Sequence, residues 1–447
     1  MSGLRYRLYR NSNLSWLGEF PEHWQLAPLK RFGRFEAGAG FPDNEQGVEG
    51  EELPFFKVNA LGKAGNDSVL VAPEDSISFE TAKRLRAYVF PPRSIAFAKI
   101  GAALLLGRLR TLPVAACLDN NMMGFMVDPP NSMRFFLYAM SLVRFDLIAN
   151  PGTVPSLNQS QIANVKLSVP PPPEQTAIAA FLDRETGKID ALVEEQKRLI
   201  GLLQEKRQAV ISHTVTKGLD SDARMKDSGI EWLGEVPAHW DLKPLKYVVS
   251  LKSGGTPSKA NSTYWDGTIP WASAKDLKVD RLSTTADQIT DTAIGDGAAS
   301  LIPAGSIIVL VRGMMLARAF PVCIATVPMA INQDLKALNG LGLDNGFLAW
   351  TLRGLEKETL SRLDEAGHGT KALRMEAWTS MHVPVPPVDE QHRIATHLEK
   401  ETRGLDDLQA EAEHTIELLL ERRVALISAA VTGKIDVRGR AEVEDAA

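Results

Sequence analysis

VPPPPEQTAIAAFLDRETGKIDALVEEQKRLIGLLQEKRQAVISHTVTK, residues 169–217, joins a run of prolines to a long periodic stretch. The prolines at 170–173 cannot continue a helix or a central strand, so they predict a stiff, extended entry. Beyond them, apolar residues recur alternately every four and three positions from Ile178 to Val210, the heptad period of a coiled coil. The stretch therefore predicts one amphipathic helix, roughly 60 Å long at 1.5 Å per residue, whose apolar stripe needs a partner.

A second copy of this stretch lies 216 positions further along the chain. Residues 385–434 read VPPVDEQHRIATHLEKETRGLDDLQAEAEHTIELLLERRVALISAAVTGK, and Glu390–Gln391 correspond to Glu174–Gln175. Two unrelated amphipathic helices are the alternative, but fifty residues in one ungapped register favour an internal repeat. We expect the two helices to pack together, and we assign the interface between them or with partner chains to Glu174, Gln175, Ile178, Leu182, Leu192, Leu203, Glu390, Gln391, Ile394, Leu398, Leu408 and Leu419.

The repeat also covers a tryptophan motif that precedes each variable region. LSWLGEFPEHWQLAPLK, residues 14–30, corresponds to IEWLGEVPAHWDLKPLK, residues 230–246, at the same offset of 216. Two tryptophans eight residues apart around a Gly and a Pro predict a docked turn. The paired His23 and His239 suggest a metal site, but no second ligand stands at a useful spacing, so we interpret both as structural.

Composition is typical of a globular protein that works in a reducing cytoplasm. The chain has 447 residues, of which 44% are hydrophobic and 23% charged. Its first residues lack an apolar signal segment, and no apolar run is long enough to span a membrane. Cys117 and Cys323 occupy non-equivalent places and fit no metal or disulfide pattern. The net charge of −5 is unusual for a nucleic-acid-binding protein.

Between the tryptophan motif and the helix of each copy lies a variable α+β region. LPFFKVNAL at 53–61 corresponds to IPWASAKDL at 269–277, and FPPRSIAFAKIG at 90–101 to IPAGSIIVLVRG at 302–313. Both blocks of the second pair end in a cation close to a glycine, so we treat Lys99 and Arg312 as equivalent sites, and further on we match Asn120–Asn121 with Asn332–Gln333. The predicted organisation is a globule at 1–155, a helical region at 156–220, a globule at 221–375, a helical region at 376–436 and a disordered tail at 437–447.

Catalytic motifs are incomplete. DPPN at 128–131 is similar to the loop of adenine methyltransferases but lacks the aromatic residue that stacks on a flipped base. EAGAG at 36–40 has no convincing dinucleotide-binding context, and the acid-x-Lys tripeptides at 276–278 and 334–336 lack an upstream Pro-Asp pair. No Ser/His/Asp or His/Cys cluster recurs in both halves. The sequence therefore predicts a binding protein that is not an enzyme and has no metal site.

The doubled plan resembles the specificity subunit of type I restriction–modification enzymes. The resemblance is carried by the P-P-x-x-E-Q entry to each helix and by SGGTPSKANSTYWDGTIPWASAKDL at 253–277, and it extends from about Leu14 to Asp436. The first half keeps the latter block only in part, as AGAGFP and LPFFKVNAL. The resemblance implies an α+β fold with two target-recognition globules, separated by two long antiparallel coiled-coil helices in a pseudo-twofold repeat.

The resemblance also implies the partners. Each globule would read one half of a bipartite double-stranded DNA sequence, and the helices would set the distance between half-sites and dock two modification subunits. Those subunits would use S-adenosylmethionine to methylate adenine, and two restriction subunits, where present, would use ATP and Mg²⁺ to translocate and cleave DNA. This chain would then carry no cofactor of its own.

Bases are read by a few polar side chains, whereas phosphate contacts only position a protein on DNA. We therefore assign DNA contacts to polar residues of predicted loops and strand ends. They are Lys57, Asn59, Lys99, Asn120, Asn121, Asn158 and Gln159 in the first half, and Thr256, Ser258, Lys259, Ser273, Lys275, Arg312, Asn332, Gln333, Lys371 and Arg374 in the second.

Two other functions fit parts of the sequence. A non-catalytic scaffold, whose helices dimerise and whose globules bind proteins, would also explain divergent globules on similar helices. A fused single-chain restriction enzyme is disfavoured by the missing motifs. Overall acidity does not exclude DNA binding, because the helices and the tail are rich in Glu and Asp and partners could supply phosphate contacts.

Overall fold

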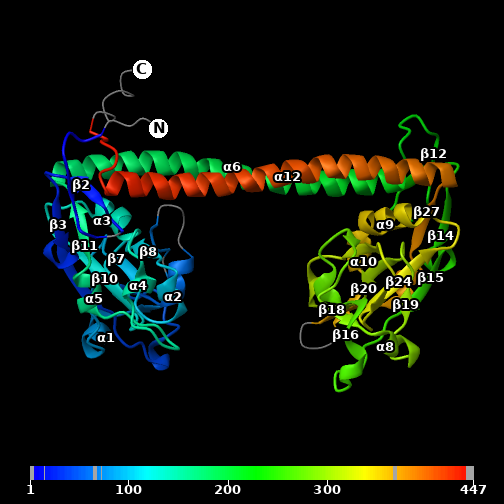
Figure 1. The fold of residues 1–447 in the computed structure, drawn as a ribbon, viewed down its shortest axis with the longest axis horizontal. Coiled ribbons are helices and arrows are strands. Elements are labelled where there is room, and N and C mark those ends of the chain that lie inside the picture. Colours follow the sequence, from blue (N-terminus) through cyan, green and yellow to red (C-terminus); the bar gives the residue numbers. More distant parts are fainter. Residues whose placement is uncertain (1–4, 15, 64–67, 72, 366–369, 439–447) are drawn as a thin grey trace. The chain divides into compact units, whose positions relative to one another are not determined.

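The computed structural model describes residues 5–14, 16–63, 68–71, 73–365 and 370–438 (Figure 1). The chain divides into two compact units. Unit 1 consists of Met1–Gln196 and His414–Ala447, and unit 2 of Lys197–Glu413. Each unit holds one globule, one end of the first long helix and the opposite end of the second.

Two long helices occupy the two copies of the repeat, as predicted. They are α6 (Pro172–Lys217) and α12 (Val388–Val431). Within unit 1, Asp190 of α6 pairs with Arg423 of α12, and within unit 2, Arg207 of α6 pairs with Asp406 of α12. Both pairs join the first part of one helix to the last part of the other, so α6 and α12 run antiparallel (Figure 1). Over the described residues, no helix combines the length and apolar character needed to cross a membrane.

The apolar residues assigned to the helix interface differ in burial. Ile178, Leu182, Leu203, Ile394 and Leu398 are buried. Leu419 is half-buried and packs against the core of unit 1.

Leu192 and Leu408 are 45% and 51% exposed, so the heptad seam predicted through them does not form between the described parts of the helices. In unit 1 the next residue, Val193, is buried in place of Leu192. A globule packs on each helix pair as well, so the buried positions follow contacts with the globule in addition to contacts with the partner helix. Contact of Leu192 and Leu408 with a partner chain stays a prediction.

Globule 1 is built on a four-stranded antiparallel sheet in the order β4-β10-β7-β8. A second sheet has the order β6-β5-β9, and β3 forms a two-stranded antiparallel sheet with β11. The strands are β1 (Tyr9–Asn11), β2 (Glu19–Pro21), β3 (Gln25–Pro28), β4 (Gly33–Ala37), β5 (Leu53–Phe56), β6 (Ser76–Ile77), β7 (Ile95–Ala98), β8 (Leu109–Thr111), β9 (Cys117–Leu118), β10 (Met122–Val127) and β11 (Lys166–Val169). The helices are α1 (Phe79–Arg84), α2 (Ala102–Leu105), α3 (Met133–Met140), α4 (Phe145–Ile148) and α5 (Gln159–Ala163).

The core of globule 1 is aromatic. Strand β10 reads MMGFMV and is apolar throughout because both of its faces are covered. Phe125 of β10 stacks on Phe35 of β4 with ring centroids 4.3 Å apart, and Phe136 of α3 lies edge-on to Phe125. Gly124 leaves room for the ring of Phe90, which a Cβ would meet at 2.3 Å. The same core continues onto α6 through Ile178 and its neighbours.

Globule 2 repeats this plan with more strands. Its main sheet has the order β15-β24-β20-β22-β17, and a second sheet the order β18-β16-β23-β19. The strands are β12 (Met225–Asp227), β13 (Glu235–Pro237), β14 (Asp241–Pro244), β15 (Val249–Ser253), β16 (Trp265–Ala272), β17 (Arg281–Leu282), β18 (Asp287–Ile289), β19 (Leu301–Ile302), β20 (Ile307–Leu310), β21 (Arg312–Gly313), β22 (Val322–Ala325), β23 (Met329–Ile331), β24 (Leu335–Gly340), β25 (Leu363–Glu365), β26 (Lys371–Leu373) and β27 (His382–Val385). The helices are α7 (Leu245–Val248), α8 (Asp291–Gly295), α9 (Asn345–Gly354), α10 (Glu356–Leu360) and α11 (Met375–Thr379).

Hydrogen bonds correct the predicted correspondence of Lys99 with Arg312. The Lys99 amide donates to the Asn121 carbonyl, and the Val311 amide donates to the Asp334 carbonyl in the same way. Lys99 therefore corresponds to Val311. Arg312 corresponds to Ile100, one position further along the strand. Successive strand residues point to opposite faces, so the two cations do not occupy equivalent sites.

The turn before β10 and β24 needs a similar one-residue correction. The Asp119 amide donates to the Phe56 carbonyl, and the Asn332 amide donates to the Ala272 carbonyl. Asp119 therefore corresponds to Asn332, and Asn120 corresponds to Gln333 instead of Asn332.

The first residues of the predicted tail are ordered. Val437 is 2% exposed in the core of unit 1, and the Arg438 guanidinium lies 4.9 Å from the centre of the Tyr6 ring. Residues 439–447 lie outside the described residues. The predicted boundary at 155/156 precedes α5 and β11, and β11 pairs with β3 of globule 1.

Candidate nucleic-acid interface and its anchoring

A buried glutamate anchors each globule to a long helix. In unit 1, Glu174 Oε1 accepts a hydrogen bond from Trp24 Nε1 at 3.0 Å, and Glu174 Oε2 lies 2.9 Å from His23 Nε2. In unit 2, Glu390 Oε2 accepts from Trp240 Nε1 at 3.0 Å. We call each Glu/His/Trp set an anchor cluster; in the second, Glu390 Oε2 also lies 2.9 Å from His239 Nε2.

The anchor clusters explain the two sequence motifs together. Each glutamate stands in the first turn of its helix, where the helix dipole favours negative charge. Its buried carboxylate needs donors, and the tryptophan motif supplies them. His23 and His239 therefore have structural partners, and no group of three metal-ligating side chains occurs among the described residues.

The glutamine that follows each glutamate makes a second link. Gln175 Oε1 accepts from the amide of Ser132 at 2.8 Å, and Gln391 Oε1 accepts from the amide of Asp344 at 2.7 Å. Ser132 and Asp344 are the N-caps of α3 and α9. Because each glutamine also donates to a carbonyl of its own proline turn, helix, turn and globule form one joint.

Further along each long helix, an acidic residue pairs with an arginine of the globule, and the two acidic residues occupy equivalent positions of the repeat. Arg134 of α3 pairs with Asp183 of α6, and Arg281 of β17 pairs with Glu399 of α12 at 2.5 Å. Asp183 also accepts from the Tyr138 hydroxyl at 2.7 Å, and burial raises the pKa of Tyr138 to about 12. The acids keep the 216-residue offset, but the arginines come from unrelated elements of the two globules.

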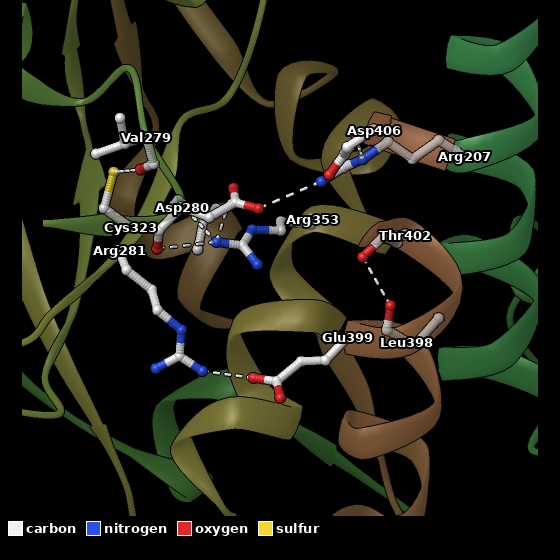
Figure 2. A network of polar contacts seen from close by, with 11 residues as sticks. Arg207, Val279, Asp280, Arg281, Cys323, Arg353, Leu398, Glu399, Thr402 and Asp406 are labelled. Atoms are coloured by element: carbon white, nitrogen blue, oxygen red, sulfur yellow. Dashed lines mark hydrogen bonds and ion pairs between the residues drawn. The ribbon is translucent and has the colours of Figure 1, made fainter. Parts of the chain in front are cut away.

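In unit 2 this contact widens into a charged network (Figure 2). Asp280 lies between two arginines, at 3.2 Å from Arg207 of α6 and 3.1 Å from Arg353 of α9. Arg207 also contacts Asp406 of α12 at 2.9 Å. Burial lowers the pKa of the Arg353 guanidinium, and the Asp280 carboxylate opposes that change. The network ties one loop of globule 2 to both long helices.

Sequence reasoning missed the charged residues that join the two helices. Asp190 and Asp406 differ by 216 positions, as do Arg207 and Arg423. The signal that could have found them was the same charged residue at equivalent positions of both repeats.

Several predicted DNA-contact residues have structural partners. Asn158 caps α5 and Ser273 caps a short turn, each in a capping box. Gln159 Nε2 donates to the Phe35 carbonyl at 2.6 Å, and Asn332 is buried with its Oδ1 accepting from the Asp334 amide. Lys57 pairs with Asp75 at 2.8 Å. These contacts hold the five side chains within the globules, and their contact with DNA stays a prediction.

Three other candidates pair with acids of globule 2; Lys275 and Arg374 are exposed, and Lys371 is half-buried. Lys275 pairs with Asp287 at 2.7 Å, Lys371 with Glu365 at 2.6 Å and Arg374 with Asp364 at 3.6 Å. Such surface pairs are weak, about 0–1 kcal/mol, so DNA phosphate could replace the acid.

The remaining candidates differ in how their side chains are held. Asn59, Asn120, Ser258, Lys259 and Arg312 are exposed, and Lys99 and Asn121 are half-buried. Asn121 also contacts the buried Asp119. Thr256 and Gln333 are exposed and joined to each other, the Thr256 hydroxyl donating to Gln333 Oε1.

Within the block at 253–277, two tryptophans of β16 hold the preceding loop, which contains Thr256. Trp271 Nε1 donates to the Gly255 carbonyl and Trp265 Nε1 to the Ser258 carbonyl, at 3.0 and 3.1 Å. The two indoles meet edge to face with centroids 5.2 Å apart. The tryptophans of this block therefore hold the loop, while its polar residues face solvent.

A family profile described as Type I restriction modification DNA specificity domain matches the chain twice, over residues 21–200 and 237–418. The Escherichia coli Type I restriction enzyme EcoR124I/EcoR124II specificity subunit is 30% identical over 179 residues, 39% of this chain and 41% of that protein. The Methanocaldococcus jannaschii Type I restriction enzyme MjaIX specificity subunit is 29% identical over 37% of this chain and 38% of its own length. The chain thus aligns with about two fifths of each of these relatives.

A longer alignment joins the chain to the Putative type I restriction enzyme MjaX specificity subunit of Methanocaldococcus jannaschii, with 22% identity over 97% of this chain and 99% of that protein. The fold is similar to a chain solved in a study of complex assembly and conformational transition of the type I R-M system. That match has a TM-score of 0.66 at 15% identity, covering 92% of this chain and 98% of the other. The HsdS subunit from Thermoanaerobacter tengcongensis matches with a TM-score of 0.50 at 16% identity, covering 93% of this chain and 98% of that chain.

Proposed function

Because the chain belongs to the family of type I restriction modification DNA specificity proteins, we propose that it recognises a bipartite DNA sequence and guides type I modification and restriction subunits to it. Each globule reads one half-site, and the long helices set the distance between the two. The observation that carries this proposal is the repetition of one scaffold with different surfaces. Both globules use the same anchor cluster, whereas the polar residues on their exposed turns differ.

The charge distribution fits DNA binding by the globules. Helix α12 holds ten acidic and five basic residues, a difference that equals the net charge of −5 of the whole chain. The rest of the chain is therefore neutral overall, so the net acidity of the chain does not oppose contact between the globules and DNA phosphates. The acidity identified in the sequence belongs chiefly to one helix.

The proposed subunit is not itself an enzyme. S-adenosylmethionine, ATP and Mg²⁺ belong to the partner subunits under this proposal, and the complex acts on DNA in the cytoplasm. The DPPN sequence at 128–131 forms a turn before α3, in which the Asn131 side chain donates to the Asp128 carbonyl. The scaffold alternative loses support because the family match covers both halves.

We also propose that two copies of the same modification subunit dock on the helices. Leu192 and Leu408 are related by the 216-residue offset, as are Leu202 and Leu418, and all four are exposed. Unit 1 holds Leu192 and Leu418, and unit 2 holds the equivalent pair, Leu408 and Leu202. Each unit thus holds one exposed leucine from each helix at equivalent positions of the repeat, which suits two identical partners.

The proposal is tested with the full chain, purified alone and together with its modification subunits. Labelled genomic fragments are incubated with each preparation at several salt concentrations, with and without labelled S-adenosylmethionine. We expect the complex to retain a subset of fragments, to methylate them, and to lose affinity steeply as salt rises. The chain alone should transfer no methyl group. Binding that ignores sequence, or methylation by the chain alone, would contradict the proposal.

A further inference from the structure

Thr256 and Gln333 meet where the loop at 253–259 touches the turn between β23 and β24 of globule 2. We propose that Gln333, held by Thr256, reads an adenine in the half-site bound by globule 2. This inference rests on the proposed function and assigns one specificity-determining contact within it.

The backbone on both sides of this contact is fixed. A Cβ at Gly254 would lie 2.1 Å from the Asn332 carbonyl oxygen, so only glycine permits the close approach of the two segments. The Gly255 amide donates to the Ile331 carbonyl at 2.9 Å. Asn332 is buried, its amide bonds to Ala272, and its side chain caps the turn at Asp334. Gln333 therefore projects from a rigid turn.

The side-chain amide of Gln333 is also oriented. Its Oε1 accepts from the Thr256 hydroxyl, and its Nε2 lies 3.4 Å from Asp334 Oδ2. A glutamine amide has two N–H donors and two acceptor lone pairs. One donor and one acceptor are left for a ligand, and they face solvent because Gln333 is exposed. A glutamine with one donor and one acceptor free can bond in a bidentate manner to N7 and N6 of adenine in the major groove.

Globule 1 has the same junction with other side chains. A Cβ at Gly38 would lie 1.9 Å from the Asp119 carbonyl oxygen, as at Gly254, and the Ala39 amide donates to the Leu118 carbonyl. Gly40 takes the place of Thr256, and Asn120 takes the place of Gln333. The backbone is repeated while its two outward side chains change. Two globules that read different half-sites need a common backbone with different side chains at this junction.

Cations stand close to the junction in sequence and in the sheet. Ser253, the first residue of the loop, pairs with Lys336 across β15 and β24. Lys336 Nζ lies 2.5 Å from Ser253 Oγ, and Lys252 Nζ donates to the Leu301 carbonyl at 2.8 Å. Lys259 ends the loop and is exposed. Lysines beside a base-reading amide can hold the phosphates that position the duplex.

The test determines the recognised sequence with the assembled complex of full chain and modification subunits. A randomised duplex library is selected by the wild type and by Gln333→Glu, Thr256→Val and Gln288→Ala. A glutamate offers acceptors only and suits the N4 amino group of cytosine. We therefore expect Gln333→Glu to shift one position of one half-site from adenine to cytosine, changing the preference about 5- to 150-fold. Thr256→Val should weaken the same preference without changing the base.

The controls separate this inference from the proposed function. Gln288→Ala removes another exposed glutamine of globule 2 and should leave the selected sequence unchanged. The second half-site should stay the same in every variant. If the wild type selects a bipartite sequence and Gln333→Glu, folded by its melting curve, selects the same one, the inference is wrong. If the wild type selects no bipartite sequence, the proposed function itself fails.

Discussion

Arg423 of α12 donates from Nε to Asp190 Oδ1 of α6 at 2.9 Å, and Arg207 and Asp406 repeat this contact at the same distance. The two pairs are related by the internal repeat, with each arginine and each aspartate displaced by 216 positions. Each pair lies within one unit, so the same antiparallel register is specified twice. Charged residues that pair across two helices favour one register because a shifted alignment leaves them unpaired.

The Asp190–Arg423 pair should be coupled in a double-mutant cycle. Both side chains are partly exposed, so we expect a coupling energy of about 0.5–1 kcal/mol from Asp190→Ala, Arg423→Ala and the double variant. Urea unfolding followed by helix circular dichroism provides the four free energies. The charge-swapped variant with Arg at 190 and Asp at 423 should recover part of the loss. Additive single effects would show that the pair does not specify the register.

The anchor cluster of unit 2 should be sensitive to removal of its acceptor. Glu390→Ala leaves the buried Trp240 N–H without its partner, which costs about 1–3 kcal/mol. We expect a matching loss in the free energy of unfolding and faster proteolysis of globule 2. Glu195→Ala removes an exposed glutamate of α6 and should change stability by less than about 0.5 kcal/mol. Equal effects of the two substitutions would contradict the anchoring role.

Asp119 predicts a pH dependence of stability. Burial raises the pKa of this carboxyl, although the amides of Val58 and Asn121 oppose the shift. The Asp119 carboxyl therefore binds its proton at a higher pH in the folded chain than in the unfolded chain, where an aspartate has a pKa of about 3.9. The contribution of Asp119 to the unfolding free energy grows as pH falls from neutral through the raised pKa towards that value. Asp119→Asn should remove this increment, as measured by urea unfolding between neutral and acid pH; an unchanged pH slope would contradict it.

Replacing two helix glycines by alanine should change the free energy of unfolding in opposite directions. A Cβ at Gly201 of α6 meets nothing within 4 Å, whereas at Gly354 of α9 it would lie 2.6 Å from Val215 Cγ2. Gly201→Ala should raise the unfolding free energy by about 0.5–1 kcal/mol, because alanine is the better helix former. Gly354→Ala should lower it by about 1–3 kcal/mol through overpacking against α6. Thermal unfolding of both variants checks the opposite signs, and the same sign for both would contradict the packing described here.

The long helices and the internal repeat could be predicted because their signals are periodic and local. The heptad spacing from Ile178 and the constant offset locate α6 and α12 without any tertiary information. The partners of Glu174 and Gln175 could not be predicted, because they lie up to 168 positions away in sequence and depend on the globule fold. Repeated charges such as Arg207 and Arg423 did carry a signal.

The surface residues were harder to predict because polarity alone does not distinguish a cap from a DNA contact. Asn158 and Ser273 are polar, but each satisfies its own turn. Sequence reasoning treats Lys99 and Arg312 as equivalent because each is a cation close to the glycine that follows an apolar strand, but the ungapped alignment of 90–101 with 302–313 pairs Lys99 with Val311. The hydrogen bonds of the folded sheets agree with that alignment, and a one-residue shift places a side chain on the opposite face.

The most direct test of the central claim is the recognised sequence of the wild type and of a variant with four residues inserted after Gln196 in α6. Genome-wide mapping of methylated adenines by the assembled complex gives both half-sites and the gap between them. Four residues lengthen a helix by roughly 6 Å, or up to about two base pairs at 3.4 Å each. We predict a bipartite sequence whose half-sites are unchanged and whose gap is longer in the variant. Altered half-sites, or an unchanged gap in an active complex, would contradict the claim that the globules read DNA and the helices set their spacing.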